Sequence, residues 1–286
     1  MRLNQEFTHE VKSMLETSKY TKPETYNALE MIAVAGAHAL EDKKTVFVGT
    51  GLPIIASTLA QLTHAPNLIP IFEAGSIGPI LEAGLPLSVG DSRAANRACL
   101  LGGLCTAFEL AQRGAVDYGF IGGAQIDIYG NVNSTMLGKF PEEYQHPKVR
   151  FPGSGGAGAM ACCCEKTIVI MVHEKRRFVK KLDYLTSPGH LDGSNDARWK
   201  AGWPGSGPIL VITNLALLDF DEKTRRMRLK SVHPGVTVDQ VKEATGFELI
   251  IPKKIQETVP PTIEELKLLR EKIDPEGYFL KKTLKE

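Results

Sequence analysis

The sequence predicts an α/β protein whose mostly parallel sheet is covered by helices on both faces. Short runs of apolar and β-branched residues alternate along the chain with segments of helical periodicity. These runs are apolar throughout, which is typical of strands buried on both faces of a parallel sheet. Several of them end in glycine-rich segments, and ligands in such folds bind where strands end. We therefore expect the functional residues in the loops that follow strands.

The first helix is predicted directly after the sequence TKPE (Thr21 to Glu24), which matches a capping box with a proline in the first turn. Apolar residues then recur at helical spacing and share a face with one glycine: Leu29, Ile32, Ala33, Gly36 and Leu40. This pattern indicates a helix that packs on the core.

The other predicted elements follow in chain order. Apolar runs that indicate strands cover residues 45–51, 68–75, 118–123, 167–172 and 209–214. Helical segments cover 54–62 and 103–114. After these, a charged stretch predicts a strand, a turn at 221–224 and a second strand, and helices are expected at 238–245 and 262–272. We treat residues 1–286 as a single domain, with 1–20 as an N-terminal extension and 260–286 as a C-terminal wrap.

The composition is that of a globular protein without a strong net charge. Lysine and arginine number 34 against 33 aspartates and glutamates, so charge favours neither nucleic acid nor an anionic membrane as a partner. No run resembles a signal peptide or approaches the roughly 18 apolar residues of a membrane span, and we expect a cytoplasmic location. The five cysteines, with three in a row at 162–164, fit neither a disulfide framework nor a zinc site. We therefore expect buried thiols and no metal.

Four glycine-rich loops carry the chemical signal, and the first three follow apolar strands directly. They are GTGLP (49–53), EAGSIGP (73–79), GGAQIDIYGNVNST (122–135) and FPGSGGAGA (151–159). Glycine lets backbone N–H groups approach a ligand closely, so these loops are expected to converge on a site that stabilises an oxyanion or a phosphate.

The loops do not match nucleotide-binding motifs in their context. No Walker sequence occurs, and the formal GxGxxG match at Gly153, Gly155 and Gly158 follows no buried strand. The β-branched run after it suggests a strand rather than a helix, so binding of NAD or ATP is disfavoured.

Glu73 is the acidic residue of most interest, because it interrupts the apolar run LIPIF at a glycine turn. A lone carboxylate at the end of a buried strand is partly desolvated if it lies in a cleft, which is typical of functional acids. On this pattern alone, a functional and a structural role both remain open.

The motifs together resemble one enzyme family. GTGLP, FEAG, FIGGAQIDIYGNVNST, FPGSGGA, IMVHEKRRFVKKLDYLTSPG, TGFEL and IDPEG occur in the order found in the β subunit of glutaconate CoA-transferase, over residues 46–277. The same order is more distantly similar to the β parts of succinyl-CoA:3-oxoacid and acetate CoA-transferases. The resemblance implies the CoA-transferase fold, which is similar to that of phosphosugar isomerases.

The resemblance also implies roles for particular residues. Glu73 is expected to be the nucleophile of a ping-pong reaction that passes through a glutamyl-CoA thioester. The oxyanion donors would lie at Gly155 and Gly156, and Asn133 or Ser134 would orient the external carboxylate. The residues expected beside the acyl-CoA are Gly122, Gly123 and Gln125. No permanently bound cofactor is expected, since coenzyme A is both substrate and covalent intermediate.

By resemblance, the chain is active only with a homologous α subunit, as α₂β₂ or (αβ)₄, and moves CoA between an acyl-CoA and a small, dicarboxylic acid such as glutaconate. Ala74 departs from the Asn or Ser that usually follows the glutamate. Two alternatives remain: an acyl-CoA hydrolase or decarboxylase of this fold, which Glu73 disfavours, and a ligand-sensing protein on the same fold.

Other candidate residues are better explained by structural roles. His173 is interpreted as a histidine at a strand end, and the run Lys175 to Arg177 as a solvated basic edge. Arg93 and Arg97 fall one helical turn apart and face either a dicarboxylate or an interface. The three consecutive cysteines have no evident base nearby and are not expected to act as nucleophiles.

Overall fold

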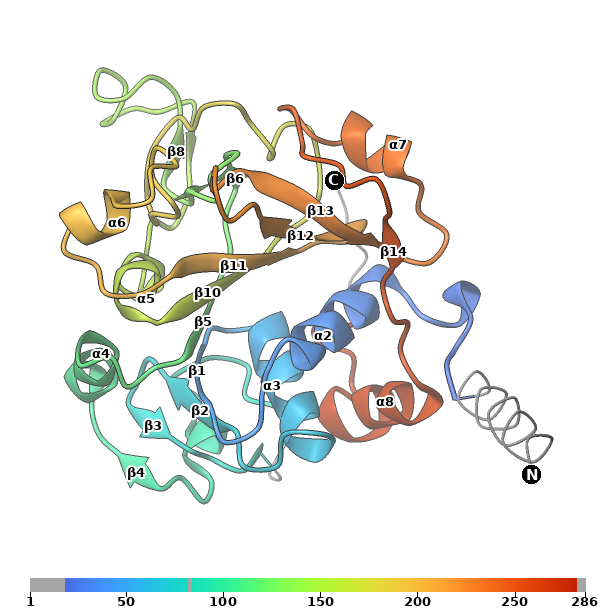
Figure 1. The fold of residues 1–286 in the computed structure, drawn as a ribbon. Helices are drawn as coiled ribbons and strands as arrows, with labels where there is room; N and C mark the ends of the chain where they lie inside the picture. The colour runs from blue at the N-terminus through green and yellow to red at the C-terminus, as the bar shows by residue number, and fades with distance from the viewer. Residues whose placement is uncertain (1–18, 82–83, 282–286) are drawn as a thin grey trace, which may run out of the picture.

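A ten-stranded sheet forms the centre of the protein in the computed structural model, which describes residues 19–81 and 84–281 (Figure 1). Its strand order is β14-β13-β12-β11-β10-β5-β1-β2-β3-β4. The strands are β1 (Thr45–Val48), β2 (Ile69–Phe72), β3 (Ser76–Ile77), β4 (Leu100–Leu101), β5 (Tyr118–Ile121), β10 (Lys166–Ile170), β11 (Gly207–Ile212), β12 (Ala216–Phe220), β13 (Met227–Val232) and β14 (Gln256–Glu257). Two hairpins lie outside the sheet: β6 (Gln125–Ile126) with β7 (Val132–Asn133), and β8 (Met136–Leu137) with β9 (Val149–Arg150).

The central strands β11, β10, β5, β1 and β2 are parallel to one another. Antiparallel pairs flank them, with β12 next to β11 and β3 next to β2, and β14 pairs parallel with β13 at one edge. Val48 at the end of β1 lies opposite Phe72 at the end of β2. The loops that begin at Gly49 and Glu73 therefore leave the sheet side by side. This register is what brings two of the predicted loops together.

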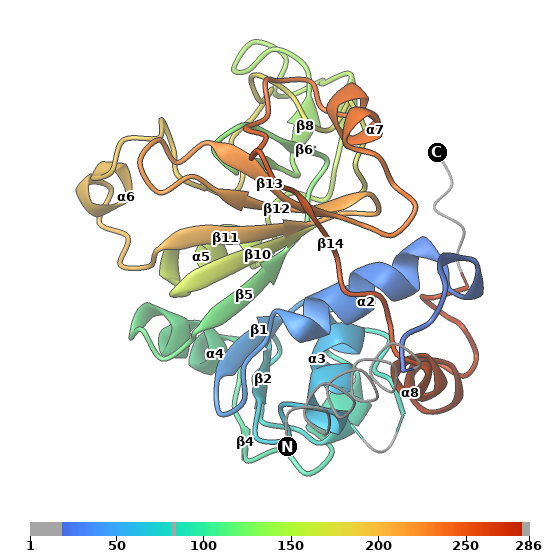
Figure 2. The same cartoon turned by 45° about the vertical axis from the view of Figure 1, so that its right-hand side comes forward.

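Helices cover both faces of the sheet (Figure 2). They are α2 (Ala28–His38), α3 (Leu52–Leu62), α4 (Leu104–Gln112), α5 (Ala157–Cys163), α6 (Ala197–Lys200), α7 (Val238–Glu243) and α8 (Ile263–Lys267). Two 3₁₀ turns, η1 (Pro23–Thr25) and η3 (Ser92–Ala95), and a π-helical segment, η4 (Leu268–Ile273), complete the helical elements of the described residues. Side chains of β1 alternate between two cores: Val46 and Val48 pack with α2 and α3, and Phe47 with α4 and α5. The predicted fold class is confirmed.

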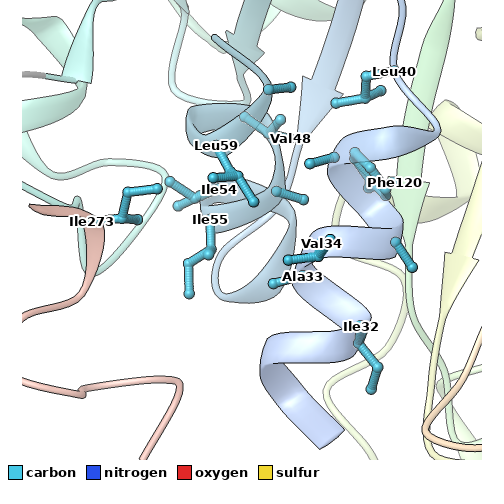
Figure 3. Packing of buried hydrophobic residues seen from close by; sticks show 14 of the residues in the cluster. Ile32, Ala33, Val34, Leu40, Val48, Ile54, Ile55, Leu59, Phe120 and Ile273 are labelled. Carbon is cyan, nitrogen blue, oxygen red and sulfur yellow. The ribbon is translucent and has the colours of Figure 1, made fainter. Parts of the chain in front are cut away.

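The core between α2 and α3 is built from branched aliphatic side chains, including Ile32 from α2 and Ile54, Ile55 and Leu59 from α3 (Figure 3). Ile273 joins this core from the C-terminal segment. A Cβ on Gly36 would lie 3.0 Å from the Ala56 Cβ, so the glycine on this face allows the two helices to approach closely.

The predicted helix start is wrong by six residues, because the N-cap is Asn27 and not Thr21. Pro23 begins only a short 3₁₀ turn, after which Tyr26 is extended. Asn27 is the actual N-cap: its side chain accepts hydrogen bonds from the Leu29 and Glu30 N–H groups, and the Glu30 carboxylate accepts from the Asn27 N–H. The sequence therefore contains two successive capping signals, and the second one forms.

The segment after the fourth glycine loop is also different from the prediction. The chain enters α5 at Ala157 instead of a strand, and β10 begins only at Lys166. Alanines favour the helix, and Met160 and Ala161 bury one of its faces in the core with Phe47. The expectation that no buried strand precedes the loop is confirmed, because both residues of β9 are exposed.

Residues 260–281 pack along α2 and contact the segment that precedes this helix. The Thr21 N–H donates to the Pro261 carbonyl at 2.9 Å, and Arg270 donates to both carboxylate oxygens of the buried Glu30 at 2.6 and 2.9 Å. The Phe279 ring lies beside Gly51 in the GTGLP loop. The ends of the predicted extension and wrap, residues 1–18 and 282–286, lie outside the described residues.

No helix in the part of the chain that the structure describes is both long and apolar enough to span a membrane.

Candidate active site

The four glycine-rich loops meet in one cleft of about 350 Å³ at the ends of β1, β2 and β5. Every loop contributes to its lining, through Gly49, Glu73, Gly122, Gly155 and Gly156. The expected convergence is thus confirmed. Larger pockets occur elsewhere on the molecule, but Glu73 does not line them.

Glu73 is half-buried at the first position after β2. Its turn is closed by Gly75, whose N–H donates to the Phe72 carbonyl at 2.9 Å. Gly75 has a φ of 102°, and a Cβ there would lie 2.5 Å from the Gly102 carbonyl oxygen. Only glycine satisfies both constraints. The close contact fixes the Glu73 turn against the start of α4.

The Glu73 carboxylate lies against the backbone of the fourth loop. A Cβ on Gly156 would collide with Oε1 of Glu73 and would lie 2.7 Å from Cζ of Phe108. Gly156 itself has an ordinary φ of −80°, so the need for glycine comes from this contact and not from backbone strain. The loop thereby gives the carboxylate a close-fitting backbone surface.

Gly155 differs from its neighbour, because it has a φ of 48° and open space around it. Among the described residues, no backbone carbonyl accepts a hydrogen bond from the N–H of Gly155 or Gly156. These two donors lie in the cleft lining beside Glu73. Free backbone donors next to a nucleophile can stabilise an oxyanion.

The GNVNST segment (130–135) fixes the fourth glycine-rich loop through hydrogen bonds. The Gly153 N–H donates to the Ser134 carbonyl, and the Ser134 hydroxyl donates to the Gly153 carbonyl, both at 2.9 Å. The Phe151 N–H donates to the Thr135 carbonyl at 2.9 Å. Ser134 therefore fixes the backbone one residue before Ser154, which lines the cleft.

Asn133 and Gln125 lie away from the cleft. Asn133 is fully buried, and its amide donates to Gln125 Oε1 at 2.8 Å and to the Met136 carbonyl at 2.7 Å. The two residues are paired across the β6–β7 hairpin. Gly123 packs under Val132 of the same hairpin, whereas Gly122 lines the cleft. The structure thus brings Glu73, Gly122, Gly155 and Gly156 together and leaves the hairpin residues behind them.

Sequence reasoning missed Phe108, which meets Glu73 at Gly156. In the sequence it is one apolar residue of an amphipathic helix, and nothing distinguishes it from the other residues that face the core. The close contact at Gly75 is what brings α4 to this position.

His173 has a structural environment, as interpreted from the sequence. It is buried, its ring stacks on Phe178 with centroids 3.9 Å apart, and its nitrogens contact the Thr213 and Thr245 hydroxyls at 3.2 and 3.0 Å. Burial, together with the nearby His233, lowers the pKa of His173 to about 4. The ring is therefore neutral near pH 7, and His173 is not part of the cleft lining.

The arginine pair is not one helical turn apart. Arg93 lies in η3, but this turn ends at Ala95, and Arg97 follows it with a φ of 53°. Two Arg93 nitrogens contact the Asp91 carboxylate at 3.0 and 2.5 Å, and this lowers the Asp91 pKa. Arg93 thus has an intramolecular carboxylate partner.

The remaining candidates are also explained by local contacts. Arg176 and Arg177 donate to Glu174 at 2.7 and 3.1 Å on the surface. Burial raises the pKa of the thiols of Cys162, Cys163 and Cys164, the last to about 12. Thiols with raised pKa values are poor nucleophiles.

Comparison with known proteins identifies the family. The coenzyme A transferase family profile matches residues 29–244. The chain is 43% identical to the β subunit of glutaconate CoA-transferase from Acidaminococcus fermentans, over 89% of this chain and 95% of that protein. It is 40% identical to the β subunit of 3-oxoadipate CoA-transferase from Pseudomonas knackmussii, over 86% and 92%.

A solved structure shares the fold. The crystal structure of glutaconate coenzyme A-transferase from Acidaminococcus fermentans superposes with a TM-score of 0.83 at 41% identity, covering 92% of this chain and 100% of that chain. The profile match, the two relatives and the shared fold place this chain in the coenzyme A transferase family, among the β subunits of the glutaconate CoA-transferase type.

Proposed function

We propose that this subunit uses Glu73 as the nucleophile that moves CoA from an acyl-CoA to a small dicarboxylic acid. One observation carries the proposal: the Glu73 carboxylate lies against the Gly156 backbone in a cleft formed by four glycine-rich loops. A carboxylate in that position is next to free N–H donors and is partly removed from water.

The reaction divides into two halves. A Glu73 oxygen attacks the thioester carbonyl, the C–S bond breaks, and CoA leaves as a thiolate while a mixed anhydride forms. The thiolate then attacks the Glu73 carbonyl, which releases the first acid as a carboxylate and leaves a glutamyl-CoA thioester. The acceptor carboxylate attacks this thioester and repeats the steps in reverse, so Glu73 ends as a free carboxylate.

The glycine loop supplies the electrostatic part of the mechanism. Each tetrahedral intermediate places a negative charge on the former carbonyl oxygen. The N–H groups of Gly155 and Gly156 are the proposed donors to it, and Ser134 keeps their loop in place. A preorganised donor of this kind typically contributes on the order of 10²–10³ in rate.

A dicarboxylic substrate is supported by the relatives, which are a glutaconate and a 3-oxoadipate CoA-transferase. Both named acids carry a second carboxylate. No lysine or arginine is among the residues that line the cleft in the described part of the chain. We therefore assign recognition of the second carboxylate to an α subunit, the partner that the names of the relatives imply for them.

The test is covalent trapping at Glu73 in the complex with the α subunit. After incubation with acyl-CoA and reduction with borohydride, mass spectrometry should find one modified peptide, spanning residues 68–79. Glu73→Ala should abolish both the adduct and CoA exchange, and Glu73→Asp, which retracts the carboxylate by one methylene, should nearly abolish them.

Glu109→Ala is the matched control, because this glutamate is exposed on α4 and pairs only weakly with Arg113. It should retain adduct formation and exchange. Exchange that proceeds without any acyl-CoA-dependent change at Glu73 would exclude the mechanism. Hydrolysis or decarboxylation of acyl-CoA without exchange would instead support the alternative activities of this fold.

A further inference from the structure

Phe108 and Glu73 share the space beside the Gly156 backbone. The point where a Gly156 side chain would begin is in contact with Oε1 of Glu73 and lies 2.7 Å from Cζ of Phe108. The carboxylate and the tip of the ring are therefore close neighbours. Phe108 reaches this point from α4, and it is not part of the cleft lining in the described region.

The ring of Phe108 is held firmly on its other side. It packs on Phe47, a fully buried residue of β1, with ring centroids 5.1 Å apart. The start of α4 is fixed by the Gly102 N–H, which donates to the Gly75 carbonyl at 2.9 Å. Gly75 also closes the Glu73 turn, because its own N–H donates to the Phe72 carbonyl, so ring and carboxylate are positioned by one piece of backbone.

We propose that Phe108 is a positioning residue, which keeps the Glu73 carboxylate against the Gly156 backbone and excludes water from the side that faces the core. The edge of an aromatic ring carries partial positive charge, so the ring tip suits a neighbouring carboxylate while offering it no competing proton. This inference rests on the role of Glu73 proposed above.

Water exclusion matters because the glutamyl-CoA thioester has two fates. A carboxylate acceptor completes the transfer. Water can instead attack the Glu73 carbonyl, break the C–S bond, release CoA as the thiol and regenerate the Glu73 carboxylate. Removing the ring should therefore slow adduct formation and raise the ratio of hydrolysis to transfer.

The experiment compares variants in the complex with the α subunit. Phe108→Ala should slow single-turnover formation of the Glu73 adduct by about tenfold to a hundredfold, the range expected when a reacting group moves by about 1 Å. The KM for acyl-CoA should change little. Phe108→Leu fills the core but does not reach Gly156. It should therefore change the rate of adduct formation and the ratio of hydrolysis to transfer in the same direction as Phe108→Ala, but by less.

Leu110→Ala is the matched control. Leu110 lies on the same helix, is half-buried like Phe108 and packs on the same core, but it makes no contact at Gly156. It should leave the ratio of hydrolysis to transfer unchanged. Gly156→Ala, whose methyl group displaces the carboxylate, should reproduce the Phe108→Ala result.

The outcomes separate the two proposals. Absence of any adduct in the unmodified complex would remove Glu73 as the nucleophile. If the adduct forms and Phe108→Ala, or Phe108→Leu where the alanine variant fails to assemble, retains the unmodified rate and ratio, Phe108 has no positioning role. An equal effect of Leu110→Ala would also overturn it, because general loss of packing would then explain the result.

Discussion

Two adjacent glycines in the fourth loop are required for different reasons. Gly155 needs the left-handed conformation, whereas Gly156 has an ordinary backbone and lacks room for a side chain beside Glu73. Sequence alone shows only a glycine-rich run. The distinction matters, because a substitution at Gly155 alters the direction of a backbone donor and one at Gly156 moves the proposed nucleophile, Glu73.

Gly155→Val should lower turnover far more than it lowers stability. A β-branched residue is disfavoured at a φ of 48°, so the loop is expected to turn its N–H away from the oxyanion, at a cost in rate on the order of 10²–10³. Gly235→Val is the control: Gly235 has a φ of 81°, is also exposed and has open space around it, but lies between β13 and α7. Steady-state kinetics and thermal unfolding of both variants give the comparison. Equal turnover in the two would contradict the donor role.

At the scale of elements, the strands were predictable because burial on both faces makes them apolar throughout. The sheet core, the helices α3 and α4 and the hairpin of β12 and β13 all lie close to the predicted segments. The sequence does not predict the helix α5, because its small residues lack a clear apolar period. The β-branched run that predicts a strand after the glycine loop begins only at Thr167, in β10.

The candidate site was predictable at the level of loops but not of side chains. Strand order and register decide which loops meet, and parallel neighbours bring Gly49 beside Glu73. The burial of Asn133 depends on its pairing with Gln125 across the β6–β7 hairpin. The polar sequence around Asn133 does not indicate this pairing. Phe108 reaches Glu73 through a contact between distant segments, which local periodicity does not encode.

Buried histidines beside the central strands predict an acid-sensitive fold. The pKa of His173 is lowered to about 4 by burial, and that of His190 likewise, against about 6.5 in an unfolded chain. Between pH 6.5 and 4 the unfolded chain therefore binds more protons, so the free energy of unfolding falls as the pH falls. The slope approaches at most about 1.4 kcal/mol per pH unit for each histidine.

Urea unfolding at a series of pH values measures this slope. His173→Gln should make it shallower between pH 6.5 and 4, and the exposed His146→Gln should leave it unchanged. An unaltered slope in His173→Gln would mean that this histidine binds protons equally in the folded and unfolded chain, which would contradict the lowered pKa.

At the scale of the whole molecule, the continuous ten-stranded sheet and the C-terminal segment tie distant parts of the chain together. Arg270 contacts Glu30, and Asn27 Nδ2 donates to the Leu280 carbonyl at 3.0 Å. The treatment of the chain as a single domain stays a prediction, for which one cooperative unfolding transition is the expected result.

By itself, the cleft would be incomplete as a binding site for the acyl-CoA and the dicarboxylate that we propose as substrates. A volume of about 350 Å³ without a lysine or arginine in its described lining offers no counter-ion for CoA phosphates or for a second carboxylate. The relatives are β subunits by name, which implies that each works with an α subunit. The missing charges are therefore expected on such a partner.

The isolated chain should accordingly show no CoA exchange, and addition of a homologous α subunit should restore it through a stable complex. Size-exclusion chromatography and an exchange assay with a panel of carboxylic acids measure assembly and activity separately. The Glu73→Ala chain is the control, because it should form the same complex and remain inactive, which separates assembly from chemistry. Substituting lysines and arginines of the α subunit near the cleft should weaken dicarboxylic acceptors more than monocarboxylic ones, since only the former lose an ion pair. Full turnover by the purified single chain would show that its own cleft is sufficient.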